Sequence, residues 1–201
     1  MENKLNIQQT LVDGVNLGIK NIVNLLLMAL LYVITLWIPY LNVGTTIGFY
    51  KAIISLSKGE PIDPTSIFSR ENYKSLGDFF LLFGLQTAGI GAAAMFFFVP
   101  AMVVSLAWQF AMYFFLDKKT SPLKSLALSY DATCGEKWRL FFTYLALGLC
   151  ICVVLFLLGL IPKVGPFLCF LGIIAVLPIT MGVEAVLYKY FSAKADALTK
   201  E

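Results

Sequence analysis

The stretch that decides the fold is residues 79–116, FFLLFGLQTAGIGAAAMFFFVPAMVVSLAWQFAMYFFL. It contains no Asp, Glu, Lys or Arg, and its single proline, Pro100, lies near the middle. A bilayer core of roughly 30 Å takes about 20 helical residues to cross, so the stretch is long enough for two passes. We therefore predict a membrane hairpin, with helices over 79–99 and 101–116 and a turn at Pro100.

The composition of the whole chain agrees with a membrane location. Of 201 residues, 59% are hydrophobic and 13% are charged, whereas soluble domains average about 25% charged residues. The length suits one compact bundle without a long linker, so we predict a single integral membrane domain over 1–201. The net charge of +3 is small and the basic residues are spread over several loops, which does not indicate nucleic acid as a partner.

Residues that commonly carry chemistry are scarce. The chain has no histidine, which removes the commonest general base and metal ligand, and we predict neither a metal nor a cofactor. None of the four cysteines forms a Cys-x-x-Cys pair and three lie in apolar runs, so we expect buried, unreactive thiols. Motifs of metalloproteases, α/β-hydrolases and P-loop enzymes are absent as well. An enzyme is therefore the least supported class, and no catalytic residue is predicted.

Apolar segments of membrane length also lie on both sides of the central hairpin. We predict spans over 22–38, 140–160 and 167–190. The segment 41–57 is less apolar, since it holds Lys51 among glycines and threonines, and it reaches only about 25 Å at 1.5 Å per residue. This segment can cross the membrane obliquely, re-enter it, or lie on its surface.

An internal similarity at an offset of 61 residues favours a membrane element at 41–57. The similarity aligns Pro39 with Pro100, Phe49 with Phe110, Lys58 with Lys119, and Pro61 with Pro122. The repeated unit would be a span, a proline turn, a return helix and a short loop helix. Six membrane elements in three hairpins follow from this pattern.

The placement of the basic residues predicts the orientation. If the second element crosses or re-enters, both termini and the loops 58–78 and 117–139 share one side. That side then holds all of the 15 basic residues except Lys51 and Lys163. By the positive-inside rule this side is cytoplasmic, so we expect both termini in the cytoplasm. A rival with five spans and an outer N-terminus moves only the two lysines of the N-terminal segment outside.

Both long loops carry a signal for a helix start. Asp63 and Ser121 each stand before a proline, which places a capping side chain ahead of proline at the first helical position. In the second loop helix we expect Ser125 to face away from an apolar face formed by Leu123, Leu126, Ala127 and Tyr130. We therefore predict two amphipathic loop helices in the cytoplasmic interface, and segment 1–21 suits an interfacial lead-in.

Small residues recur at four-residue spacing in the central hairpin. Gly84, Ala88 and Ala92 form such a series. Small side chains let membrane helices approach closely, so we predict a helix-packing face here, with a ligand channel as the alternative. The hairpin also holds a few polar residues, namely Gln86, Thr87 and Gln109. They are too few to hydrate a pore, and we expect them to bond across helices.

Glu184 is the most informative single residue. A carboxylate within an apolar helix is rare enough to indicate function, and Pro178 should kink the same helix. Lys51 is the expected partner, because both residues lie about six residues, or roughly 9 Å, from the basic ends of their helices. We therefore predict an intramembrane polar site of Lys51 and Glu184. Structural pairing or snorkelling, simple interfacial placement, and substrate or proton handling are all open as its role.

Several local patterns occur together in a way that is familiar. They are the glycine-rich return helix that ends in Tyr50, the Lys58-Gly59-Glu60 turn, Ile67-Phe68, Pro100 at a helix start, Leu126-Ala127-Leu128-Ser129 before Gly135, and the closing 178–188 helix. With these features, the chain from about 21 to 190 resembles a widespread, uncharacterised family of small bacterial integral membrane proteins. That family is similar in look to the membrane-anchor domain of some glycerophosphodiester phosphodiesterases. The resemblance implies six helices in a bacterial inner membrane and no catalytic residues, although Ala101 stands where the family often has glycine.

The sequence thus predicts an all-α polytopic bundle of three helical hairpins with two interfacial loop helices. The leading hypothesis is a non-enzymatic structural or regulatory module in the membrane. Its partners would be the lipid bilayer and another membrane protein or a lipid. The second hypothesis is a small transporter or lipid-handling protein that uses Lys51 and Glu184. A membrane enzyme is third.

Overall fold

The structure is a computed structural model that describes residues 4–161 and 165–199. Within these residues the regular elements are all helical and none is a strand, which confirms the all-α fold. The predicted outer turn at Lys163 and the basic residue Lys200 lie outside the described residues.

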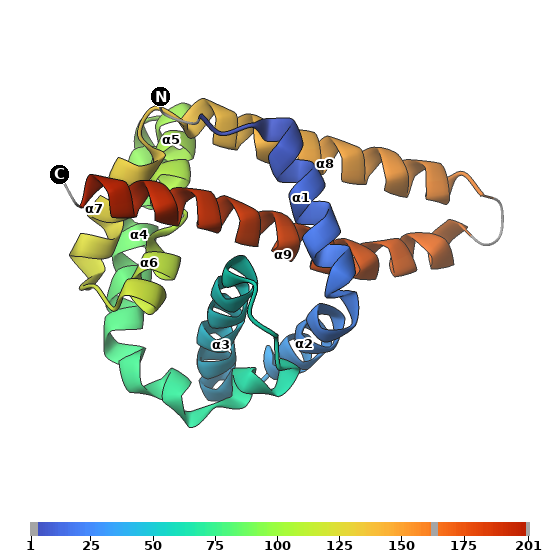
Figure 1. The fold of residues 1–201 in the computed structure, drawn as a ribbon, viewed down its shortest axis with the longest axis horizontal. Helices are drawn as coiled ribbons and strands as arrows, with labels where there is room; N and C mark the ends of the chain where they lie inside the picture. Colours follow the sequence, from blue (N-terminus) through green and yellow to red (C-terminus); the bar gives the residue numbers. More distant parts are fainter. Residues whose placement is uncertain (1–3, 162–164, 200–201) are drawn as a thin grey trace.

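The helices follow each other closely along the chain (Figure 1). In chain order they are α1 (Ile7–Lys20), α2 (Ile22–Thr35), α3 (Pro39–Lys58), the 3-10 helices η1 (Pro64–Phe68) and η2 (Arg70–Ser75), α4 (Leu76–Phe96), α5 (Phe98–Trp108), α6 (Ala111–Lys118), α7 (Pro122–Thr133), α8 (Lys137–Gly159) and α9 (Gly165–Leu198).

Four helical segments of the described chain are long and apolar enough to cross a membrane. They are Arg70–Phe96, Phe98–Lys118, Lys137–Gly159 and Phe167–Leu198. α1 and α2 are long and apolar enough only when taken together, and because they are bent by 81° they form either a broken fifth span or a re-entrant loop. The long apolar helices predicted for the second and third hairpins are therefore confirmed. The predicted turn at Pro100 was wrong, since α4 and α5 are separated at Phe97 and Pro100 lies in the first turn of α5. α3 does not qualify, so the six-element arrangement stays a prediction.

α9 lies at the centre of the molecule. It packs against α1, α2, α3, α7 and α8, and Figure 1 shows it running across the middle of the ribbon. Aromatic rings fill the space beside it: the ring centroids of Phe110 and Phe191 are 4.8 Å apart, and those of Tyr113 and Tyr188 are 5.1 Å apart. Because lipid is as apolar as a protein core, such packing contacts are what hold membrane helices together.

α1 and α9 approach each other closely at three glycines. A Cβ added at Gly14 or Gly18 would run into the backbone of α9 at Val183 or Pro178, and one added at Gly182 would run into the backbone of α1. Gly14 and Gly18 have the Gly-x-x-x-Gly spacing of tightly packed membrane helices, a sequence signal absent from the predictions above. The N-terminal helix is therefore packed against the bundle at α9, and its location in the membrane interface stays a prediction.

Two sets of small side chains lie on the outside of the chain. Gly84, Ala88 and Ala92 are exposed, and a Cβ at Gly84 would meet no atom within 4 Å. No helix of the described chain covers this predicted packing face, so a helix that packs on it would have to come from another molecule. The prediction of buried cysteines was wrong, since the exposed thiols are those of Cys134, Cys150 and Cys152.

The first loop is capped as predicted but forms shorter helices than expected. The carboxylate of Asp63 accepts from the backbone N–H of Thr65 at 3.0 Å and from its hydroxyl at 2.8 Å. These two bonds hold the pKa of Asp63 below its usual range, and the bond from the backbone N–H has the larger effect. The segments that follow are the 3-10 helices η1 and η2. In the second loop, Ser121 precedes α7 without a side-chain cap bond.

The apolar face predicted for α7 lies partly on the outside of the bundle. Leu123 and Tyr130, which were expected on this interfacial face, are 68% and 50% exposed. A stripe of hydroxyl side chains at four-residue spacing, Ser125, Ser129 and Thr133, is fully buried instead. Hydrogen-bonding groups are buried at a cost unless they find partners, so this stripe must meet polar groups of the bundle.

Candidate functional site

The return helix of the central hairpin is broken at Gln109 and Phe110, between α5 and α6. Such a break releases backbone groups from the helical hydrogen bonds, and in apolar surroundings they must be paired within the protein. Ser129 of α7 pairs two of them. Its hydroxyl donates to the carbonyl of Ala107 at 2.7 Å and accepts from the N–H of Phe110 at 3.2 Å. The break is therefore the reason why α7 turns its hydroxyl stripe inward.

Gln86 of α4 pairs a third backbone group beside the break. Its amide nitrogen donates to the carbonyl of Trp108 at 2.7 Å, which joins α4 to the end of α5. This bond crosses helices, as the sequence predicts. Thr87 does not follow that prediction, because its hydroxyl donates to the carbonyl of Phe83 in its own helix at 2.8 Å.

The break also directs Gln109 toward the carboxylate of Glu184. The amide nitrogen of Gln109 donates to the hydroxyl of Tyr144, and that hydroxyl donates to Oε2 of Glu184 at 2.5 Å. Tyr113 is a further hydrogen-bond partner of the same carboxylate. Glu184 is therefore held by uncharged donors from the break, α6 and α8, and it forms no ion pair with any described residue.

Lys51 does not meet Glu184. Its ammonium group donates to Oδ1 of Asn72 at 2.9 Å, and the buried Asn72 amide donates to the carbonyl of Ile67 at 3.0 Å. Lys51 and Asn72 line a small polar pocket of about 270 Å³ between α3 and the η1–η2 loop. The predicted polar site of Lys51 and Glu184 therefore does not form. The η1–η2 loop supplies Asn72 as the partner of Lys51, and this could not be predicted from the sequence of the Lys51 helix alone.

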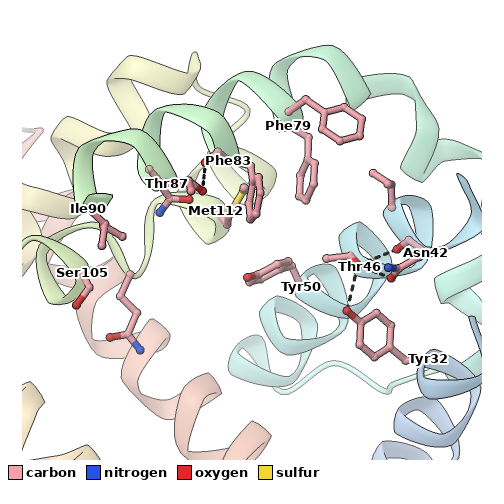
Figure 2. Close-up of a pocket in the computed structure, with 14 residues that line it drawn as sticks. Tyr32, Asn42, Thr46, Tyr50, Phe79, Phe83, Thr87, Ile90, Ser105 and Met112 are labelled. Carbon is pink, nitrogen blue, oxygen red and sulfur yellow. Dashed lines mark hydrogen bonds between the residues drawn. The ribbon is translucent and has the colours of Figure 1, made fainter. Parts of the chain in front are cut away.

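A larger cavity of about 700 Å³ opens between α3 and α4, as Figure 2 shows. Its volume lies within the range of about 300–1,000 Å³ that is typical of ligand pockets. Its apolar walls are formed by Val43, Phe79, Phe80, Phe83, Ile90 and Met112. All the described residues that line it are uncharged. The cavity is therefore shaped for an apolar body with a few polar groups.

Polar groups lie along two sides of this cavity. On the α3 side, the hydroxyl of Thr46 donates to the carbonyl of Asn42 at 2.7 Å and lies 3.1 Å from the hydroxyl of Tyr32. Gln86 and Gln109 line the other side, which belongs to α4 and the end of α5. The cavity therefore places polar groups on two facing elements of an otherwise apolar lining.

Tyr50 connects the cavity with the Glu184 cluster. Figure 2 shows its ring reaching from α3 into the space between α3 and α4. Behind the cavity its ring meets that of Tyr113 edge to face, with centroids 5.0 Å apart, and Tyr113 is bonded to Glu184. Gln109 also lines the cavity and takes part in the Glu184 cluster, so the buried carboxylate lies directly behind the cavity wall. The three side chains that link the carboxylate to the cavity are uncharged.

Pro178 does not interrupt its helix, because α9 runs unbroken through it. The proline lies where α9 crosses α1, since a Cβ at Gly18 would run into the carbonyl of Pro178. The predicted kink stays a prediction. In the described ranges 4–161 and 165–199, no three His, Cys, Asp or Glu side chains gather where they could hold a metal ion.

Some residues of the site were not found from the sequence. Tyr113 and Tyr144 are ordinary aromatic residues of apolar helices, and only the fold brings them to Glu184. Ser129 had a detectable signal, since hydroxyl residues repeat at 125, 129 and 133. That spacing places them on one helix face.

The chain was compared with protein-family models, with curated proteins and with solved structures, and none of the three comparisons found a match. The resemblance to an uncharacterised bacterial membrane family therefore stays a hypothesis. The geometry of the cavity and of the Glu184 cluster is what bears on function.

Proposed function

We propose that the chain is a non-enzymatic integral membrane protein that holds a lipid-like amphiphile in the cavity between α3 and α4. The observation that carries this proposal is a ligand-sized cavity with aromatic and aliphatic walls, an uncharged polar lining and a break in the helix beside it. Helices are broken within membranes mainly where the irregular backbone lines a binding site or is buried in protein. This favours the lipid-handling hypothesis, with Glu184 near the cavity and Lys51 outside it.

The proposed location is a bacterial inner membrane, with both termini in the cytoplasm and α3 as a short or re-entrant element. Support comes from the four or five apolar segments of membrane length and from the distribution of basic residues. Reporter fusions test the topology. A reporter in the loop 58–78 and one at the N-terminus should report the same side, whereas opposite sides would favour the five-span rival.

A photoactivatable amphiphile tests the cavity. The purified protein is incubated with a stearyl chain that carries a diazirine, irradiated, digested and mapped by mass spectrometry. Labels should concentrate on peptides that contain 42–50 and 79–90. Ser105→Trp places a large ring in the cavity lining and should remove these labels. The control Val153→Trp lies on a lipid-facing position of α8 that is 56% exposed, and it should leave them unchanged.

The proposal fails if the label spreads evenly over the exposed apolar surface, or if both tryptophan variants reduce labelling equally. An even spread means that the probe only samples the surrounding bilayer or micelle. An equal reduction means that labelling reports folding rather than occupancy of the cavity.

A second candidate function is a module that packs against a partner helix. The exposed series Gly84, Ala88 and Ala92 on α4 favours it, because small residues at this spacing suit close helix contacts. Gentle purification followed by mass spectrometry tests this candidate. A co-purifying membrane protein that is lost on Gly84→Leu would support it, and retention of that protein in the variant would contradict it.

A further inference from the structure

The amide of Gln86 can be oriented in only one way. The group that it meets is the backbone carbonyl of Trp108, at 2.7 Å from the amide nitrogen. A carbonyl oxygen can only accept hydrogen bonds, so the nitrogen of Gln86 must face it. The carbonyl oxygen of Gln86 is then the end of the side chain that is left for other partners.

The amide of Gln109 is oriented by the Glu184 cluster in the same sense. The hydroxyl of Tyr144 donates its single proton to the carboxylate of Glu184. Its oxygen can then only accept from Gln109, which must present its nitrogen. Gln109 therefore also keeps its carbonyl oxygen for other partners.

Both free carbonyl oxygens belong to residues that line the large cavity. Neither oxygen accepts a hydrogen bond from a described residue. Among the described side chains, the fully buried polar atom that lacks a partner is an oxygen of Glu136, so the two glutamine oxygens are not fully buried. The two oxygens are therefore accessible. They are one hydrogen-bond acceptor from α4 and one from the α5–α6 break.

The hydroxyl protons of the cavity lining are mostly committed elsewhere. Those of Thr46, Thr87 and Ser105 are donated to backbone carbonyls of their own helices. The lining donors with an unused proton are the amide of Asn42 and the hydroxyl of Tyr50, both on α3, and the second N–H of the Gln86 amide on α4. A ligand hydroxyl can donate to a glutamine oxygen and accept from the α3 side at once, because a hydroxyl is both donor and acceptor.

Charge narrows the ligand class further. No described lining residue is charged. An anionic head group would meet no cation there and would lose its hydration. A cationic head group would lose its hydration in the cavity, while the Glu184 oxygens are already bonded to uncharged donors.

We propose that the cavity selects an uncharged lipid that carries a free hydroxyl, a lipid alcohol, through the carbonyl oxygens of Gln86 and Gln109. This inference rests on the proposed function, because it names the head-group class for the same cavity. The hydroxyl donates its one proton to a glutamine oxygen, and the alkyl chain lies along the aromatic wall of α4.

Four probes with one stearyl chain and one diazirine position test the selection: the alcohol, its methyl ether, the amine and the carboxylate. Each competes at equal concentration for the cavity of the purified full-length protein. We expect the alcohol to label peptides 42–50 and 79–90 at least tenfold more than the ether. The ether keeps the oxygen but has no proton to donate, and it leaves the glutamine acceptors unpaired. The amine and the carboxylate should label these peptides no better than the ether.

Gln109→Met keeps the approximate size of the side chain but removes one of the two acceptors, and it should reduce the preference for the alcohol over the ether. Thr87→Val is the matched control, since it removes a lining hydroxyl whose proton is already used, and it should keep the preference. Should Gln109→Met fail to fold, the ratio of alcohol to ether labelling in the unmodified protein still decides.

The outcomes separate the two proposals. Equal labelling by alcohol and ether overturns the head-group inference and leaves the lipid cavity intact. Stronger labelling by the amine or the carboxylate also overturns it and assigns a charged head group instead. Failure of all four probes to label the cavity peptides above the rest of the surface overturns the proposed function itself.

Discussion

Replacing Ser129 with alanine should destabilise the fold more than removing a hydroxyl that bonds only within its own helix. The change leaves the N–H of the fully buried Phe110 without its partner, and it removes the 2.7 Å bond to the carbonyl of Ala107. An unpaired buried donor costs about 1–3 kcal/mol, and a lost bond about 0.5–1.5 kcal/mol. Thr133 lies 3.4 Å from the same carbonyl and offsets part of the second loss. We therefore expect the free energy of unfolding to fall by about 1–4 kcal/mol.

Unfolding in mild detergent micelles with increasing sodium dodecyl sulfate measures this loss, and thermal unfolding followed by size-exclusion chromatography checks it. For a chain of this size, about 1 kcal/mol corresponds to roughly 2–4 °C, so the Tm should fall by roughly 2–15 °C. Ser105→Ala is the control, because that hydroxyl only donates to the carbonyl of Met102 in its own helix. It should change stability by about 0.5 kcal/mol or less. Equal stability of the two variants would refute the role of Ser129 in pairing the broken helix.

Three further predictions concern other parts of the fold. Gly182→Ala should prevent α1 from packing on α9 and should leave little folded protein, because the new Cβ would run into the backbone of α1. The control Gly84→Ala adds a methyl group in open space, and it should be neutral or stabilising by up to about 1 kcal/mol. The carboxyl group of Asp63 should titrate below its usual value of about 3.9 in a pH series of carboxyl NMR spectra. Its cap then contributes stability above the ordinary pKa and loses it as the pH falls through the lowered one, and titration at the ordinary value would contradict the cap. Asn72→Ala should lower the free energy of unfolding by about 1–3 kcal/mol, because it leaves Lys51 and the carbonyl of Ile67 without their partner. Thermal unfolding measures this loss, and an unchanged Tm would show that water takes the place of the Asn72 amide.

The fold class and the apolar helices were predictable because hydrophobic length is a local property of the chain. The run 79–116 contains no charge to interrupt it, and the helices of the second and third hairpins follow from the same criterion. The close contact of α1 with α9 was also predictable from the sequence, because Gly14 and Gly18 have the four-residue spacing of closely packed membrane helices. It was missed because the segment is polar, and a polar segment is expected at the membrane surface rather than inside a bundle.

The candidate site was predictable only in part. Glu184 stood out from the sequence because a carboxylate is costly in an apolar helix and needs partners. Those partners could not be named, since Tyr144, Tyr113 and Gln109 are distant in the chain and have no shared pattern. Lys51 was assigned to Glu184 by depth alone, whereas the loop that follows α3 folds back and supplies Asn72 instead.

The uncharged run 79–116 by itself determined that this protein consists of apolar helices of membrane length, because the energy of placing a residue in lipid depends mainly on that residue. The tertiary structure decided where the return helix breaks, which hydroxyls turn inward and where the cavity opens. Those features depend on hydrogen bonds between groups far apart in the chain. A buried polar group takes whichever partner the packing brings within reach.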